Sequence, residues 1–470
     1  MALKPVMLLT DALIYLLAAV TVAFILYARG KEHLREPWRQ VGRSAMAMAS
    51  LIVLLAYIGI GLLDSIHFQR ALPGDPGRSR VHYASDVTSV LDMVLQPLRE
   101  HVEKTYSAPF ATHLYSKETM EGSDGSTIRA YPRLKYGGAG LKDPRRDRWS
   151  DIAATAGVAL LQALGLWLVL VTLVAGILAR RHRRGLWRIV RDMAAGRLAL
   201  PWRTMLATTG ILLLLGTLGA GLGVKYHVFG TDKVGQDVFY QSLKSVRTGL
   251  VIGTLTTLVM LPFAVFLGIM AGYFRGWVDD IIQYIYTTLN SIPGVLLIAA
   301  AILTLQVFMR THPELFGIIA YRADLRLLFL CIILGITSWT GLCRLLRGET
   351  LKLSEIDYIQ AASAFGVGHF RIIVRHILPN VMHIVLISVV LDFSGLVLAE
   401  AVLSYVGVGV DPTMNSWGNM INAARLEMAR DPIVWWSLLS AFVMMFVLVL
   451  AANLFSDAVR DAFDPRLRKQ

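Results

Sequence analysis

The residues of this chain that could carry chemistry gather in and beside one apolar run, residues 381–406. Asp392 stands inside the run, where a carboxylate costs about 2.5–3.5 kcal/mol on insertion scales. Such a group usually faces a cavity or a partner, so three interpretations are open: a place on a solute pathway, an internal hydrogen bond, or a wrong boundary for the run. Glu400 lies nearer the outer end of the run, where helix packing and gating are equally open.

A polar connection, residues 344–380, precedes this run. Ser354 with Asp357 three residues later is a variant of the capping box and predicts the start of a helix. The helix would continue through Gln360, Ala361 and Ala362, good helix formers with small side chains. Another protein could therefore approach this helix closely.

The second half of the connection predicts a turn and a return to the membrane. Gly366 permits the positive-φ turn that ends one short helix before a second, at about 368–376. After Leu378, Pro379 is expected to end that second helix and to redirect the chain. The result would be a helix-turn-helix bracket that projects from the bilayer.

Motifs of enzymatic chemistry do not occur in the sequence. There is no G-x-x-x-x-G-K-[ST], no H-E-x-x-H and no G-x-S-x-G. Cys331 and Cys343 lie twelve residues apart on one expected helix, and a separation of about 18 Å is too large for a disulfide. We therefore expect no catalytic residue, no bound cofactor and no metal site on this chain.

The composition indicates an integral membrane protein. Of 470 residues, 55% are hydrophobic and 17% charged, with a mean hydropathy of +0.56, whereas a soluble chain has about 25% charged residues. A helix of about 20 apolar residues crosses a bilayer. The formal net charge of +13 fits the excess of basic residues in cytoplasmic loops, and we expect no nucleic-acid partner. Nine spans are predicted, at about 6–28, 44–63, 152–179, 204–224, 248–272, 283–309, 326–343, 381–406 and 434–456.

Basic clusters predict the orientation of these spans. One cluster lies between Arg29 and Arg43, after the first span, and a denser one between Arg180 and Arg191, after the third. Both should be cytoplasmic, which places the N-terminus and residues 65–150 outside and the C-terminus inside. Residues 65–150 are long enough to form a small extracytoplasmic domain.

Gly268 and Gly272 form a G-x-x-x-G pattern in the fifth expected span. Two glycines on one helix face let another backbone approach closely. Packing within the chain and an interface with a second subunit are both open for this face.

The polar connection resembles the EAA loop of ATP-binding-cassette (ABC) importer permeases, through Gln360-Ala361-Ala362, Gly366 and Leu378-Pro379. The neighbouring residues resemble the dipeptide, oligopeptide and nickel branch, the type with a "C" subunit, and the likeness extends over roughly residues 200–470. Gln360 stands where the family usually has Glu, Gln236 where it usually has Arg, and His376 where an apolar residue is common. The further matching motifs are Gly230-Thr231-Asp232, Gly235, Asp237-Val238, Ala271–Asp279, Ala399-Glu400-Ala401, Leu403-Ser404, Ser416-Trp417-Gly418, Arg460-Asp461 and Asp464-Pro465-Arg466.

The resemblance implies an all-α polytopic fold of about nine transmembrane helices, with a six-helix permease core. The core would cover 201–470, with the EAA loop at 354–380. The additional parts would be two N-terminal helices in 1–64, the extracytoplasmic domain 65–150, and a third helix with a basic linker in 151–200.

The resemblance also implies a function in the bacterial inner membrane. The chain would be the permease of an ATP-driven importer of peptides or peptide-like solutes, with Gln360, Ala361, Ala362, Gly366, Leu378 and Pro379 coupling it to the ATPase. Its partners would be a second permease, two ATPase subunits that hold ATP and Mg, an external solute-binding protein and membrane lipid. Two alternatives are open: a nickel or metal-chelate importer, and a scaffold or sensor with 65–150 as receptor.

Overall fold

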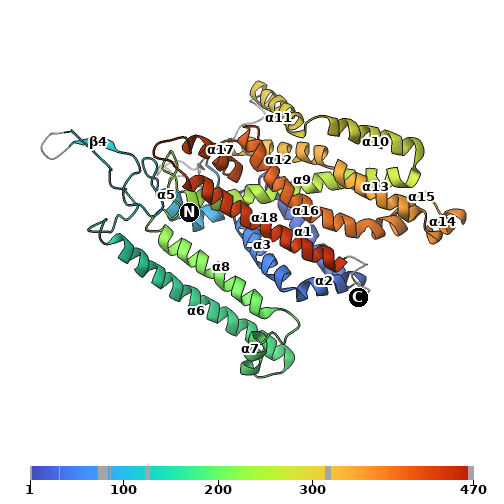
Figure 1. Cartoon of the computed structure of the whole chain (residues 1–470), viewed down its shortest axis with the longest axis horizontal. Coiled ribbons are helices and arrows are strands. Elements are labelled where there is room, and N and C mark those ends of the chain that lie inside the picture. Colours follow the sequence, from blue (N-terminus) through green and yellow to red (C-terminus); the bar gives the residue numbers. More distant parts are fainter. Residues whose placement is uncertain are drawn as a thin grey trace, which may run out of the picture.

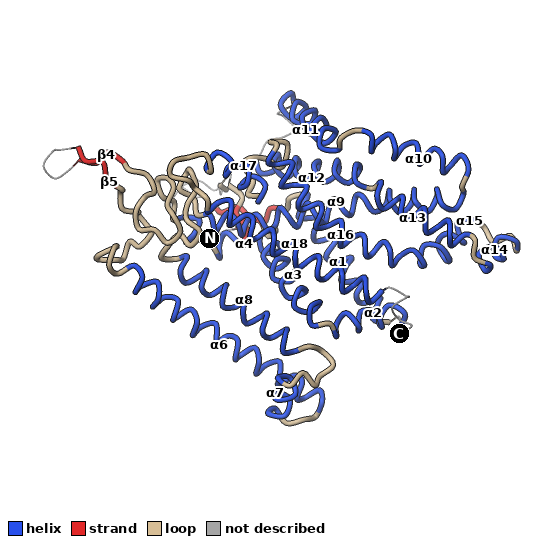
Figure 2. Tube along the Cα trace, viewed as in Figure 1, coloured by secondary structure: helices blue, strands red, loops and turns tan. Residues whose placement is uncertain are grey.

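The computed structural model describes residues 3–30, 32–71, 83–84, 86–121, 127–312 and 319–463. Most of these residues form helices, drawn in Figure 1 and coloured by secondary structure in Figure 2. The all-α prediction is therefore confirmed. The long helices are α1 (Leu9–Arg29), α3 (Ala45–Asp64), α6 (Arg148–His182), α8 (Trp202–Gly223), α9 (Val238–Phe274), α10 (Gly276–Ser291), α11 (Gly294–Thr311), α12 (Ile319–Ser338), α13 (Thr340–Ser354), α16 (Leu378–Tyr405) and α18 (Trp436–Phe463).

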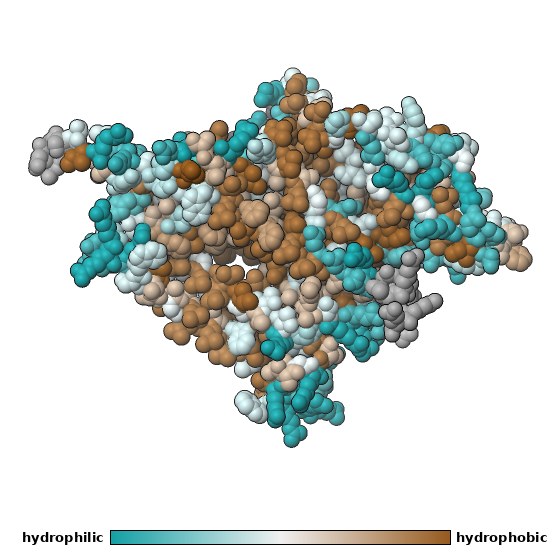
Figure 3. All heavy atoms as spheres, in the orientation of Figure 1, coloured by the Kyte–Doolittle hydropathy of each residue, from teal (hydrophilic) through white to brown (hydrophobic). Residues whose placement is uncertain are grey.

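Eight helices of the described residues are long and apolar enough to cross a membrane, and they coincide with eight of the nine expected spans. The expected span 6–28 corresponds to α1, within which Leu9–Ala23 is an apolar helical stretch. Apolar residues form a broad band across the middle of the molecule, and hydrophilic residues gather at its ends (Figure 3). The eight helices are Ala45–Asp64, Arg148–His182, Trp202–Gly223, Val238–Phe274, Gly294–Thr311, Ala320–Ser354, His369–Tyr405 and Trp436–Phe463.

The expected continuous span 283–309 is wrong in one respect, because the chain breaks there into α10 and α11. Ile292 ends α10 in an extended conformation, with φ −91° and ψ 128°. A residue before proline is pushed out of the helical region, and Pro293 follows. As a result α10 packs against α9, whereas α11 packs against α12.

The helical core is built around α9. Helices α3, α10, α12, α13 and α16 all contact α9, and α18 closes the bundle against α3 and α16. The N-terminal helix α3, expected outside the core at 201–470, therefore packs directly against core helices. Helix α8 packs along α6 and also contacts α3 and α7, so α6 and α8 form a hairpin beside the bundle (Figure 1). The shorter helix α2 (Glu32–Arg43) contacts α18, and α7 (Leu186–Ala194) covers the tip of the hairpin.

Both glycines of the G-x-x-x-G pattern lie at a close contact between two helices of this chain. A Cβ on Gly268 would lie 2.8 Å from the carbonyl oxygen of Cys343, and one on Gly272 would lie 2.6 Å from Cβ of Thr350. Both neighbours belong to α13, so the pattern brings α9 and α13 into close contact.

The segment 65–150 packs onto the bundle. Strand β2 (His67–Arg70) pairs antiparallel with β1 (Leu3–Val6) and with β3 (Thr88–Ser89), so the segment shares a sheet with the N-terminus. Strands β4 (Glu118–Glu121) and β5 (Thr127–Ala130) form a hairpin that projects from this end (Figure 1). Three short helices complete the end: α4 (Val90–Val94), α5 (Gln96–Glu100) and α17 (Trp417–Glu427).

Candidate functional site

The expected helix-turn-helix bracket is present at one end of the bundle, called here the loop end (Figure 1). It consists of α14 (Asp357–Ala364) and α15 (His369–Ile372). Gly366 lies between them with φ +77°, a conformation that glycine adopts at little cost. Val367 N–H donates to the carbonyl of Ala362 at 3.1 Å and closes the turn.

The bracket presents small residues and two aromatic rings to solvent. Gln360 and Ala361 are exposed and Ala362 is half-buried. The side chains of Phe365 and Phe370 are 87% and 80% exposed. Two strongly exposed aromatic side chains within six residues of one turn indicate an interaction surface. The sequence analysis did not single out this pair, although two phenylalanines flanking a Gly-Val-Gly turn were a usable signal.

Buried isoleucines fasten the bracket to the helical core. Ile359, Ile372 and Ile377 are at most 2% exposed and belong to one apolar cluster with residues of α9 and α13. On the outer side, the hydroxyl of Tyr273 and Nδ1 of His369 are 2.8 Å apart. A displacement of the bracket would therefore be passed to α9 and α13.

Two details differ from the expected geometry. Ser354 does not cap α14, because its hydroxyl donates to the carbonyl of Leu351 and it ends α13. The chain also does not change direction at Pro379, because a π-helical turn, η2 (Ile373–Ile377), joins α15 to α16. Leu378 and Pro379 are the first two residues of α16, where the missing N–H of proline is tolerated.

Asp392 lies on α16 and is half-buried. Among the described residues it makes no hydrogen bond and no ion pair, which leaves the interpretation as an internal hydrogen bond without support. A carboxylate in a span that has no partner among the described residues fits a group that faces a cavity or another subunit.

Glu400 is buried at a contact between two helices. It is 2% exposed and accepts a hydrogen bond from the hydroxyl of Ser404 at 2.7 Å. A Cβ on Gly418 would lie 2.6 Å from Oε1 of Glu400, so α17 approaches α16 closely at this point. Three of the sequence motifs, at 399–404 and 416–418, thus meet at one contact.

The opposite end of the bundle, called here the motif end, carries the turn 227–237. Asp237 caps α9 by accepting from the N–H of Tyr240 at 3.0 Å. The ring of His227 lies between two carboxylates, 2.7 Å from Asp237 and 3.4 Å from Glu103. Burial acts to lower the pKa of His227, but these two carboxylates raise it to about 9. An ion-paired histidine thus joins the segment 65–150 to the start of α9.

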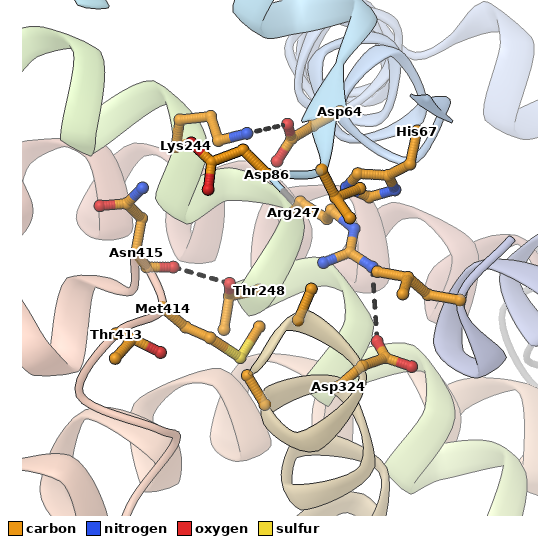
Figure 4. Close-up of a pocket in the computed structure, with 14 residues that line it drawn as sticks. Asp64, His67, Asp86, Lys244, Arg247, Thr248, Asp324, Thr413, Met414 and Asn415 are labelled. Atoms are coloured by element: carbon orange, nitrogen blue, oxygen red, sulfur yellow. Dashed lines mark hydrogen bonds and ion pairs between the residues drawn. The ribbon is translucent and has the colours of Figure 1, made fainter. Parts of the chain in front are cut away.

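A cavity of about 580 Å³ opens at the motif end between α3, α9, α12 and the loop 413–415 (Figure 4). Lys244 and Arg247, one turn apart on α9, point into it, and Thr248 donates to the carbonyl of Asn415 at 2.7 Å. The sequence analysis missed both cations, although a lysine and an arginine at the start of an apolar helix are a recognisable signal.

Carboxylates from other elements pair with both cations. Nζ of Lys244 lies 2.6 Å from Asp64, and Arg247 lies 2.6 Å from Asp11 and 3.7 Å from Asp324. Because Leu8 and Asp64 line the cavity and Asp11 pairs with Arg247, residues before position 65 form part of this site. Among the described residues no group of three or more His, Cys, Asp or Glu side chains could hold a metal ion.

Comparison with known proteins identifies the family. Residues 264–469 match the model of the binding-protein-dependent transport system inner membrane component. The chain is 32% identical over 242 residues to the glutathione transport system permease protein GsiD of Pectobacterium atrosepticum, which covers 52% of this chain and 73% of the relative. It is 31% identical to the dipeptide permease DppC of Bacillus subtilis (52% of this chain, 70% of the relative). It is 33% identical to the oligopeptide permease OppC of Mycobacterium bovis (52% and 77%).

These matches confirm the resemblance drawn from the EAA loop and its accompanying motifs. They agree with a multi-pass protein of the bacterial inner membrane, and they describe a transport component that depends on a separate binding protein. The chain belongs to the family of binding-protein-dependent ABC transport permeases.

Proposed function

We propose that this chain is a permease subunit of an ATP-driven importer for peptides or peptide-like solutes. The observation that carries the proposal is the exposed bracket α14–α15, with its small-residue helix, its Gly366 turn and its buried attachment to the core. The relatives are named as permeases of glutathione, dipeptide and oligopeptide transport systems, and these names support peptides as the class of cargo.

In this proposal the bracket enters a groove on a separate ATPase subunit. Gln360, Ala361 and Ala362 form the side that approaches the groove, and Phe365 supplies an apolar anchor beside it. Leu378 and Pro379 begin α16, so movement of the bracket passes into a membrane helix. ATP and Mg belong to the ATPase subunits, and cargo would use a pathway shared with a second permease.

The proposed orientation places the loop end in the cytoplasm and the motif end outside. The two ends lie on opposite sides of the apolar band (Figure 3), and the basic clusters after α1 and α6 favour the cytoplasm. The N-terminus and residues 65–150 would then face the binding protein. Because Cys331 and Cys343 are both buried, single cysteines at Ser116 and Ser363 should react with an impermeant reagent from opposite sides. Labelling from one side only would overturn this topology.

Copurification with the ATPase subunits tests the coupling role. Ala362→Arg adds a long charged side chain to the docking side and should abolish both ATPase association and cargo-stimulated hydrolysis. Gln40→Arg is the matched control, because Gln40 is exposed on α2 at the loop end and away from the bracket. It should behave like the parent. Normal coupling in the Ala362→Arg protein would overturn the proposal.

The cargo is tested separately in vesicles that contain the whole complex. We expect a dipeptide to stimulate ATP hydrolysis and a nickel chelate to have no effect. Stimulation by the nickel chelate alone would favour the metal-importer alternative, and no stimulation by any solute would favour the scaffold.

A further inference from the structure

The hairpin of α6 and α8 has a surface that neither the helical core nor the bracket explains. Helix α6 begins at the motif end, where the hydroxyl of Tyr226 donates to Asp151 at 2.8 Å, and it runs to the opposite side of the apolar band. Along its length it exposes large apolar side chains, among them Leu173 at 59% and Ile177 at 64%. These residues are in position to contact lipid chains.

A cavity of about 670 Å³ opens where α6 ends. The part of its wall nearer the middle of α6 is apolar and includes Leu173 and Ile177, and the part at the end of α6 carries Arg180, Arg183 and Arg184. Arg184 is paired with Asp192 at 3.3 Å, but Arg180 and Arg183 have no acidic partner among the described residues. The cavity therefore combines unpaired positive charge with an apolar wall.

The segment that contains this cavity's arginines carries a large excess of positive charge. Residues 180–197 contain seven arginines and one acidic residue. Such a concentration attracts an anion, and the field of neighbouring guanidinium groups favours a phosphate.

Helix α7 begins at the cavity, where its first residue, Leu186, is part of the lining. Ile189 and Met193 are buried against α6, whereas the indole of Trp187 is 82% exposed. A helix with one buried apolar face, an arginine-rich face and an exposed tryptophan is typical of the membrane–water interface. The arginines then stand at the level of the lipid headgroups, with the apolar wall below them.

We propose that this cavity binds an anionic phospholipid. The phosphate contacts Arg180 and Arg183, and an acyl chain lies along Leu173 and Ile177. A small soluble phosphate would satisfy the arginines but leave the apolar wall uncovered, so a lipid is the better fit. The site belongs to the hairpin and does not depend on the identity of the cargo.

Native mass spectrometry of the full chain in detergent tests the site, with phosphatidylglycerol and phosphatidylcholine of identical acyl chains as probes. The parent should bind phosphatidylglycerol in preference, with an excess that falls as salt is added. The double variant Arg180→Gln/Arg183→Gln should reduce phosphatidylglycerol affinity roughly thirtyfold and leave phosphatidylcholine binding unchanged. The matched control is Arg145→Gln/Arg146→Gln, an exposed pair at the motif end, which should retain the preference.

Three results would overturn the proposal: equal binding of the two lipids by the parent, an undiminished preference in the double variant, or displacement of the lipid by an equal concentration of glycerol phosphate. The last result would indicate a site for a small phosphate. If the double variant does not fold, Arg183→Gln alone should still weaken phosphatidylglycerol binding by several-fold.

Discussion

Truncation of Phe365 gives a quantitative test of the bracket as a docking surface. Its side chain is 87% exposed in the isolated chain. Burial of a phenylalanine removes about 150 Å² of apolar surface from water, which at about 25 cal/mol per Å² corresponds to nearly 4 kcal/mol. Alanine keeps part of this contact, and interface anchors commonly lose about 2 kcal/mol on truncation. Phe365→Ala should therefore weaken ATPase binding about thirtyfold.

The assay is a titration of purified ATPase against the permease complex in nanodiscs, followed by fluorescence anisotropy. Phe365→Leu should lose much less affinity, because it retains most of the apolar surface. Phe266→Ala is the control, since Phe266 is 64% exposed but lies on α9 within the apolar band. An unchanged Kd for Phe365→Ala, or an equal loss for Phe266→Ala, would refute the assignment of Phe365 as an anchor.

Three further predictions concern packing, pH and the solute pathway. Gly272→Ala should destabilise the protein by about 1–3 kcal/mol through overpacking and lower its melting temperature, whereas Gly216→Ala, with open space around the added Cβ, should not. The raised pKa of His227 contributes stability that is complete below about pH 6.5 and is lost as the pH rises through about 9. Protease resistance of the segment 65–150 should therefore fall over that range in the parent. The variant His227→Gln should not show this pH dependence. Asp392→Asn should change transport rate or selectivity in vesicles while the complex still assembles, and parental transport would argue against a role in the pathway.

Several features of this protein could be predicted from the sequence because their physical cause is local. Long uncharged runs can only be buried in lipid or in a core, so most spans were placed correctly. The bracket was predicted because small residues favour a short helix and Gly366 allows its turn. The family resemblance followed from the same residues.

Local signals near the bracket were less reliable where tertiary packing competes with them. The proline at position 379 predicted an abrupt change of direction, but a single π-helical turn accommodates it and keeps the helix continuous from α15 into α16. Serine is a residue type that favours the N-cap of a helix, yet Ser354 ends the preceding helix. In both cases the alternatives differ by about one turn of backbone, and the isoleucines that follow Ser354 and precede Pro379 are packed in one buried apolar cluster.

The sequence by itself determined the class of the protein, its membrane segments and the bracket that we propose as its coupling element. Only the tertiary structure showed that α3 packs against the core, that Glu400 is held at the contact of α16 with α17, and that Lys244 and Arg247 pair with carboxylates far away in the chain. The reason is physical. When a membrane helix is apolar on every side, its sequence does not indicate which face contacts a neighbouring helix. A charged residue likewise does not reveal its partner when nearly 240 positions separate Asp11 from Arg247.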